Sequence, residues 1–131
     1  MATNPLNLVD SSGWIEFFTD GPNAGMFADP LSEASRLVVP TVSLYEVFRV
    51  VLRRRGEDDA LRAAALMSRG REIPLSSALA LEAARLAHHR SLAMADGIIL
   101  AAARLTGATL WTQDVDFEGI PHVRYFPRVP A

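Results

Sequence analysis

The feature that most constrains the fold of this chain is a short apolar run near the N-terminus that ends in a carboxylate. Leu6-Asn7-Leu8-Val9 is followed by Asp10, two serines and a glycine. A short run of Leu and Val is typical of a buried strand. Ser11 and Ser12 are residue types that cap helices. The sequence therefore predicts a strand that ends at Asp10 and a helix that follows it directly.

Short apolar runs alternate with helical patterns along the rest of the chain. Further strands are expected at residues 37–39, 71–75, 108–112 and 123–126. Helices are expected at residues 12–19, 23–36 with an interruption near Pro30, 41–55, 57–69, 77–89 and 96–105. This alternation predicts an α/β fold of three layers. Its centre would be a mostly parallel sheet of about four to five short strands, flanked by helices.

The bulk composition places the chain among small globular proteins. Its 131 residues are 50% hydrophobic, which predicts one domain over residues 1–131 with a substantial core. The chain has no cysteine, which excludes disulfides and thiolate metal sites. Neither a secretion signal nor an apolar run of membrane-spanning length is recognisable. We therefore expect a cytoplasmic protein without a membrane partner.

Five acidic residues are predicted to meet at one edge of the sheet. Asp10 and Asp114 each come after a strand, and parallel strands bring their carboxyl ends to the same edge. Asp116 lies two residues further on, within the same turn. Asp96 is expected to be the N-cap of a helix, oriented by backbone N–H groups. Glu46 lies off the apolar stripe of its own helix and has the reach to approach the same edge.

Such a cluster has a chemical consequence, because crowded carboxylates repel one another unless a cation neutralises them. Ligands that are all oxygen suit Mg²⁺ or Mn²⁺. A hard cation held in this way, with free positions for water and phosphate oxygens, can serve phosphodiester hydrolysis. The sequence therefore predicts a metal-dependent site for phosphate chemistry.

Each acid also has an ordinary structural interpretation. Asp96 could be a plain helix cap, and Glu46 could pair with Arg49 or Arg53 on its own helix. The two acids after the fourth strand could be turn residues. Asp10 is the hardest to explain in this way, because the end of a buried strand is an unfavourable place for an unpaired carboxylate.

Taken together, four motifs resemble the PIN-domain family, and within it the VapC-type toxins of bacterial and archaeal toxin–antitoxin pairs. The resemblance covers essentially the whole chain. The motifs are Val9-Asp10-Ser11-Ser12, Pro40 followed by a helix that carries Glu46, Ala95-Asp96-Gly97 at the start of an Ala-rich helix, and Thr112-Gln113-Asp114-Val115-Asp116-Phe117. Gly97 stands where Ala is commoner, which should slightly weaken the start of that helix.

The resemblance implies a metal-dependent endoribonuclease toxin that cleaves phosphodiester bonds in RNA, either tRNA or rRNA, with Mg²⁺ or Mn²⁺. It further implies a homodimer, and inhibition by a VapB-type antitoxin whose C-terminal segment lies across the active-site groove. The implied metal ligands are Asp10, Asp96 and Asp114. Glu46 and Asp116 would complete the acidic pocket, and Ser11 and Thr112 would support it through hydrogen bonds.

Two other functions remain open at this point. One is a PIN-fold module that keeps its acids but mainly binds RNA or a protein, and the other is a metal-dependent phosphatase that acts on small monoesters. The run Arg53-Arg54-Arg55 has two interpretations as well: a solvated helix end that complements the helix dipole, or a path for the RNA backbone. His88 and His89 are expected at the surface.

Overall fold

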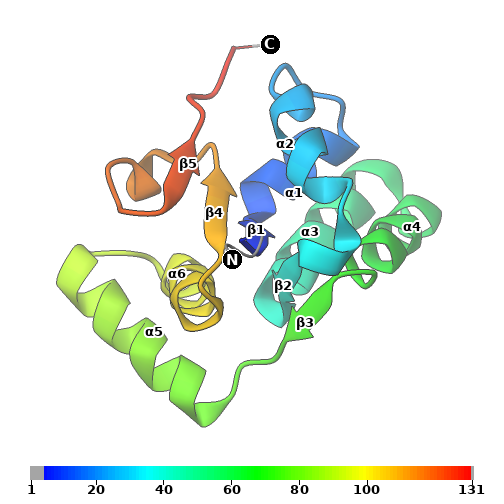
Figure 1. Ribbon diagram of the computed structural model, residues 1–131. Helices are drawn as coiled ribbons and strands as arrows, with labels where there is room; N and C mark the ends of the chain where they lie inside the picture. Colours follow the sequence, from blue (N-terminus) through cyan, green and yellow to red (C-terminus); the bar gives the residue numbers. More distant parts are fainter. Residues whose placement is uncertain (1–4, 131) are drawn as a thin grey trace.

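The computed structural model describes residues 5–130, in which short strands alternate with helices (Figure 1). The strands are β1 (Asn7–Val9), β2 (Val38–Pro40), β3 (Arg71–Ile73), β4 (Thr109–Thr112) and β5 (Val123–Tyr125). The α-helices are α1 (Ser11–Phe18), α2 (Ala24–Leu31), α3 (Thr41–Arg55), α4 (Glu57–Met67), α5 (Ser77–Arg90) and α6 (Met94–Thr106). Two 3₁₀ turns complete the fold, η1 (Ala34–Arg36) and η2 (Val115–Phe117).

Every strand pairing among residues 5–130 is parallel, which confirms the predicted fold class. β4 lies between β1 and β5, and β2 pairs with β3. A single parallel bridge between Asn7 and Leu37 joins the two parts. The strands are so short that the sheet is nearly interrupted at this point. Val9 lies opposite Trp111, so β1 and β4 end side by side.

Alternate residues of the strands face two separate hydrophobic cores. Leu8 and Leu110 belong to the core beneath α5 and α6, whereas Val9 and Val39 belong to the core beneath α1, α3 and α4. Successive side chains of a strand point to opposite faces of the sheet, so each strand contributes to both cores. Figure 1 shows the resulting layers, with α5 and α6 on one side of the strands and α1, α3 and α4 on the other.

The start of α1 differs from the prediction. Asp10, rather than Ser11 or Ser12, is the N-cap, and its carboxylate accepts a hydrogen bond from the backbone N–H of Gly13. Asp is as good an N-cap as Ser, and the chain enters the helix without a linking residue. The same side chain therefore ends the strand and begins the helix.

Asp96 was also expected to be an N-cap, and this prediction is wrong. α6 begins earlier, after Ala93, and Asp96 is the third residue of the helix. The helix dipole favours an acid anywhere in the first turn, so the sequence alone does not distinguish a cap from a first-turn residue. The predicted helix at 23–36 is likewise divided into α2 and η1, and it breaks one residue after Pro30.

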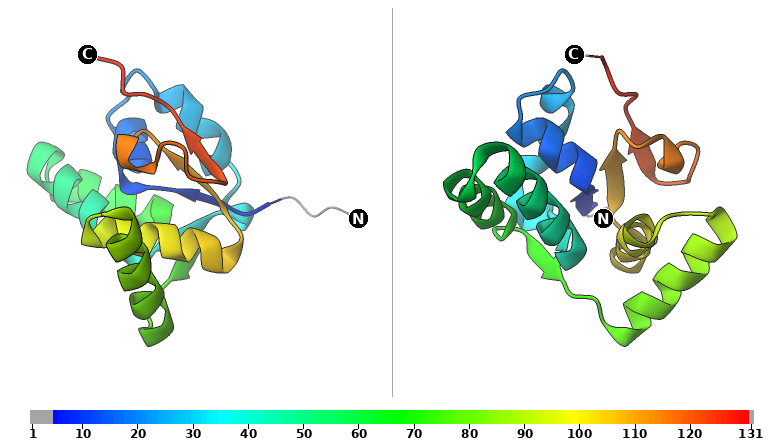
Figure 2. Two further views of the ribbon diagram at one scale, coloured as in Figure 1. Left: turned by 90° about the vertical axis from the view of Figure 1, so that its left-hand side faces the viewer. Right: turned by 180° about the vertical axis from the view of Figure 1, so that it is seen from behind.

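α3 and α4 form a long hairpin between β2 and β3. α3 has the predicted bounds, Thr41–Arg55, and Gly56 follows it with φ 90°, a conformation that favours glycine. Figure 2 shows this hairpin extending beyond the end of β1 from which the chain enters α1. α3 therefore passes the carboxyl edge of the sheet and continues outward. No helix within residues 5–130 is long and apolar enough to cross a membrane.

Candidate active site

Asp10 is fixed at the carboxyl end of β1 by a complete set of hydrogen bonds. Its side chain is buried, with 3% of its surface exposed. Oδ1 accepts from the Ser12 hydroxyl at 2.6 Å and from the Gly13 N–H at 3.0 Å, and Oδ2 accepts from the Thr112 hydroxyl at 2.6 Å. Burial outweighs these bonds and raises the pKa of Asp10 to about 6.

Thr112 connects Asp10 to the next acid, because its hydroxyl both donates and accepts. Its oxygen accepts the backbone N–H of Asp114 at 2.9 Å while its proton goes to Asp10. Asp114 is in turn the N-cap of η2, and its Oδ1 accepts the backbone N–H of Asp116 at 3.0 Å. The end of β4 and the turn after it therefore hold both acids in place relative to Asp10.

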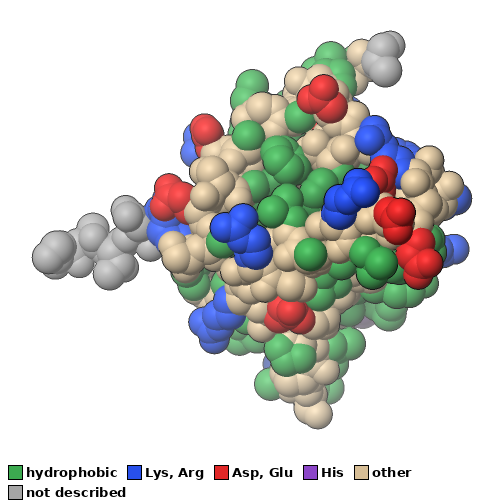
Figure 3. Space-filling view, turned by 90° about the vertical axis from the view of Figure 1, so that its right-hand side faces the viewer, with side chains coloured by type: hydrophobic (Ala, Val, Ile, Leu, Met, Phe, Trp, Pro, Cys, Tyr) green, Lys and Arg blue, Asp and Glu red, His purple; other side chains and the backbone are tan. Residues whose placement is uncertain are grey.

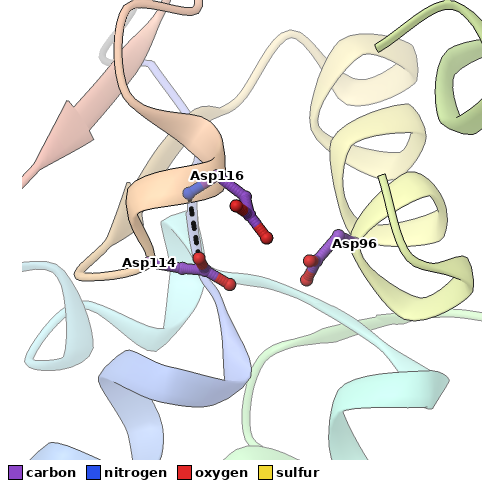
Figure 4. Close-up of side chains that lie close together, drawn as sticks. All are labelled: Asp96, Asp114 and Asp116. Carbon is purple, nitrogen blue, oxygen red and sulfur yellow. Dashed lines mark hydrogen bonds between the residues drawn. The ribbon is translucent and has the colours of Figure 1, made fainter. Parts of the chain in front are cut away.

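Asp96 faces these two acids from α6. Figure 4 shows its carboxylate directed toward those of Asp114 and Asp116. Each of the three side chains offers an oxygen within 4.8 Å of the other two. Partial burial raises the pKa of Asp96 to about 7, with further increases from the charges of Asp114, Asp10, Asp116 and Glu46.

Glu46 joins the site from α3. Its Oε1 accepts the Ser11 hydroxyl at 2.6 Å. Within residues 5–130 no ion pair joins it to Arg49 or Arg53, so the alternative of a pair within its own helix is not realised. Ser11 thus supports Glu46 rather than Asp10, and Thr112 supports Asp10.

The five predicted acids therefore gather at the carboxyl edge of β1 and β4, but in two sets. The closely spaced set is Asp96, Asp114 and Asp116. Asp10 and Glu46 are not members of this set, and both oxygens of Asp10 accept hydrogen bonds. The expected ligand set of Asp10, Asp96 and Asp114 therefore differs from the closest grouping by one residue, with Asp116 in the place of Asp10.

The donor chemistry of the close set fits a hard divalent cation. All of its members are carboxylates, and both His88 and His89 are exposed on α5 as expected. Burial raises the pKa of Asp96 most, and repulsion between its ionised form and the neighbouring acids raises it further. A cation bound between these oxygens would remove this repulsion.

Sequence reasoning missed two polar residues of this region. It assigned Ser12 to helix capping alone, whereas the Ser12 hydroxyl binds Asp10 directly. Gln113 was not singled out, yet its buried side chain accepts from Asn23 at 3.1 Å and fixes the loop before α2 against the end of β4. For Ser12, the available signal was its position two residues after an acid at a strand end. For Gln113, the sequence held no signal.

Comparison with known proteins agrees with this architecture. The sequence model of the PIN domain matches residues 8–123, so the chain belongs to the PIN domain family. No curated protein sequence matches it.

Several solved structures share the fold. A toxin–antitoxin complex from Klebsiella pneumoniae has 24% identity and a TM-score of 0.80, over 94% of this chain and 99% of that one. Mycobacterium tuberculosis VapC20, a toxin that cleaves the sarcin–ricin loop, has 23% identity and a TM-score of 0.72, over 89% and 98%. DNA-bound VapBC from Salmonella typhimurium has 19% identity and a TM-score of 0.69, over 95% and 98%.

Proposed function

We propose that this chain is a metal-dependent endoribonuclease and acts as the toxin of a VapC-type toxin–antitoxin pair. The observation that carries the proposal is the close set of three carboxylates on the edge where β1 and β4 end, backed by Asp10 and Glu46. Membership of the PIN domain family supports a nuclease, and similarity of fold to VapC20 and to VapBC complexes supports a toxin.

In this proposal Asp96, Asp114 and Asp116 hold Mg²⁺ or Mn²⁺, with Asp10 contributing through its fixed negative charge. The cation, when bound, lowers the pKa of water and stabilises negative charge on phosphate oxygens. The carboxylates align the attacking water by accepting its protons in hydrogen bonds. The water oxygen forms a new bond to phosphorus and gives up a proton to a neighbouring carboxylate, one P–O ester bond breaks, and the leaving oxygen takes up a proton in turn.

The supporting hydroxyls have a defined task in this proposal. Ser12 and Thr112 donate to Asp10, and Ser11 donates to Glu46, so neither carboxylate is free to rotate away from the substrate. Preorganised charges of this kind do not have to reorient during the reaction. The site residues of the proposal are therefore the five acids, with hydroxyls that hold two of them in position.

The proposal includes the partners that such a toxin requires. These are an RNA substrate, tRNA or rRNA, a VapB-type antitoxin that covers the site, and a second copy of the chain in a homodimer. The chain would act in the cytoplasm as a single domain over residues 1–131. The similarity of fold to toxin–antitoxin complexes supports the antitoxin in particular.

The test is cleavage of total RNA by the purified chain, free of antitoxin, with Mg²⁺ or Mn²⁺ and with EDTA. Asp96→Asn and Asp10→Asn should abolish metal-dependent fragments. Asp29→Asn, an exposed acid on α2, is the matched control and should cleave like the parent.

Three results would contradict the proposal. Fragments that persist in Asp96→Asn would mean that cleavage does not depend on this site. Binding of RNA without cleavage by folded, metal-loaded protein would favour a binding module. A small chromogenic phosphomonoester, run beside the RNA, should remain intact, and its hydrolysis would indicate a phosphatase instead.

A further inference from the structure

We infer that three exposed side chains of α3, those of Tyr45, Arg49 and Arg53, bind the RNA beside the scissile phosphate. Tyr45 would stack on an unpaired base, and the two arginines would hold neighbouring phosphates. This inference rests on the proposed function and adds to it a substrate-binding surface on α3.

The acidic site creates the need for such a surface. Five carboxylates meet at one edge of the sheet, and RNA is a polyanion, so the site repels every phosphate except the one that a cation holds. Cationic side chains close to the site must offset this repulsion if the flanking nucleotides are to bind. Several arginines are already engaged. Arg36, Arg62 and Arg85 each form an ion pair, and Arg124 lies over the Trp111 ring at 4.6 Å.

Arg49 and Arg53 are not engaged in this way. Both are exposed, and neither has an ion-pair or hydrogen-bond partner among the side chains of residues 5–130. Arg53 follows Glu46 by seven residues, or close to two helical turns, so both project from nearly the same side of α3, about 10 Å apart along its axis. α3 extends outward past the carboxyl edge of the sheet (Figure 2). The two arginines therefore lie further along α3, on the part of the helix that leads outward from the site to which Glu46 belongs.

The other arginines of the run 53–55 have a different orientation. Arg54 and Arg55 line a pocket between α1, α3 and α4, together with Phe18 and Arg62. The face of the molecule over α2 and α4 mixes arginines with hydrophobic and acidic side chains (Figure 3). Positive charge alone therefore does not identify a path for RNA. Alignment with Glu46 along α3 selects Arg53 and its neighbour Arg49.

Tyr45 completes the surface with an aromatic ring. Residues 45, 49 and 53 are spaced by four, so their side chains are neighbours on the helix. Tyr45 is 64% exposed. Together with Arg49 it lines a groove of about 480 Å³ between α3 and α4, whose other lining residues include Leu44, Phe48 and Leu52. An apolar groove, an exposed ring and unpaired guanidinium groups match an unstacked base and its phosphates.

The experiment measures binding of a short fluorescein-labelled single-stranded RNA by fluorescence anisotropy over a range of KCl concentrations. It uses the full chain in the Asp10→Asn background, so that the probe stays intact. Arg49→Gln and Arg53→Gln should each reduce the slope of log K against log salt by about 0.7, and together by about twice that. Arg104→Gln, which removes an exposed arginine at the far end of α6, should leave the slope unchanged.

Tyr45 is tested in the same assay. Tyr45→Ala should weaken binding about 5- to 150-fold, the range that loss of one stacked base gives. Tyr45→Phe keeps the ring and should retain the affinity of the parent. A double-stranded RNA probe should respond less to either change, because its bases are already stacked.

The results separate this inference from the proposed function. The inference would be overturned, and the nuclease left intact, by two results together. The parent would cleave RNA in a metal-dependent way, and Arg49→Gln and Arg53→Gln would each show the same salt slope as Arg104→Gln. A parent that neither cleaves nor binds RNA would overturn both. Unchanged RNA affinity with an altered sedimentation coefficient in the Arg49→Gln/Arg53→Gln variant would assign this face to a protein contact instead.

Discussion

Thr112 is the residue on which the order of the site depends most. Its hydroxyl donates to Asp10 and accepts from the backbone of Asp114, so it joins the two strand ends through one atom. We expect Thr112→Val to reduce the free energy of unfolding by about 1–3 kcal/mol, because the change leaves buried polar groups without partners. Loss of the donor should also raise the pKa of Asp10 above its value of about 6.

Urea unfolding and RNA cleavage, measured on the same samples, test this prediction. The matched control is Thr109→Val, which makes the same substitution in β4, where the half-buried hydroxyl has no hydrogen bond within residues 5–130. The control should change stability by about 0.5 kcal/mol or less and cleave RNA normally. Equal losses of stability in Thr112→Val and Thr109→Val would mean that the hydrogen bonds of the Thr112 hydroxyl contribute nothing beyond strand propensity.

Individual residues were predictable from the sequence where their chemistry is unusual for their position. Asp10 stood out because a buried strand end disfavours an unpaired carboxylate. The roles of Ser11 and Ser12 were not predictable, because two adjacent serines offer the same group. Only the direction of each side chain decides that Ser11 reaches Glu46 and Ser12 reaches Asp10.

Among the helices, the contact of α5 with α6 explains the glycine that follows Asp96. The sequence suggests that Gly97 weakens the helix, and on propensity alone alanine would be better by about 1 kcal/mol. However, a Cβ at position 97 would lie 2.8 Å from the carbonyl oxygen of Ala83 and 3.0 Å from the Cβ of Ala87. We therefore expect Gly97→Ala to destabilise the protein by about 1–3 kcal/mol and to reduce cleavage, because α6 must move and carries Asp96 with it.

Gly25→Ala is the matched control for this substitution. Gly25 lies in α2, and a Cβ there would meet no heavy atom within 4 Å. It should stabilise the protein by about 0.5–1 kcal/mol, the ordinary advantage of alanine in a helix. Thermal unfolding of both variants decides the matter, and a Gly97→Ala variant as stable as Gly25→Ala would refute the steric explanation.

Elements were predictable in proportion to their length and periodicity. α3 was predicted with its bounds, because an apolar stripe over four turns, a proline before it and a glycine after it all agree. The near break between β1 and β2 was not predictable, because it depends on how closely three-residue strands approach one another. The start of α6 was misplaced because an acid is favourable throughout a first turn.

At the scale of the whole molecule, the gathering of acids makes stability depend on pH in an unusual direction. Asp10 and Asp96 have pKa values of about 6 and 7 in the folded protein, against an ordinary value of 3.8. The folded state therefore binds more protons than the unfolded state between pH 4 and 7. Without a cation, this contribution to stability is fully present below pH 4 and is lost as pH rises to 7.

Asp10→Asn should remove the part of this pH dependence that comes from Asp10, because the amide side chain carries no charge to desolvate. Relative to the parent, the metal-free variant should gain stability as pH rises from 4.5 to 7.5, by about 2 kcal/mol for the shift of Asp10. Urea unfolding at several pH values measures the difference. A constant difference across this range would mean that Asp10 titrates at its ordinary pKa.

A divalent cation should reverse the same trend. The cation and the protons compete for the carboxylate oxygens, so Mg²⁺ or Mn²⁺ should raise the melting temperature more at pH 7.5 than at pH 5. At a concentration one hundred times the dissociation constant, the stabilisation amounts to about 2.7 kcal/mol. Asp96→Asn should lose most of this gain, because Asp96 is the only member of the close set that α6 supplies. Asp29→Asn should keep the gain in melting temperature. A gain that is equal at pH 5 and pH 7.5 would place cation binding elsewhere on the molecule, and so would a gain that Asp96→Asn retains in full.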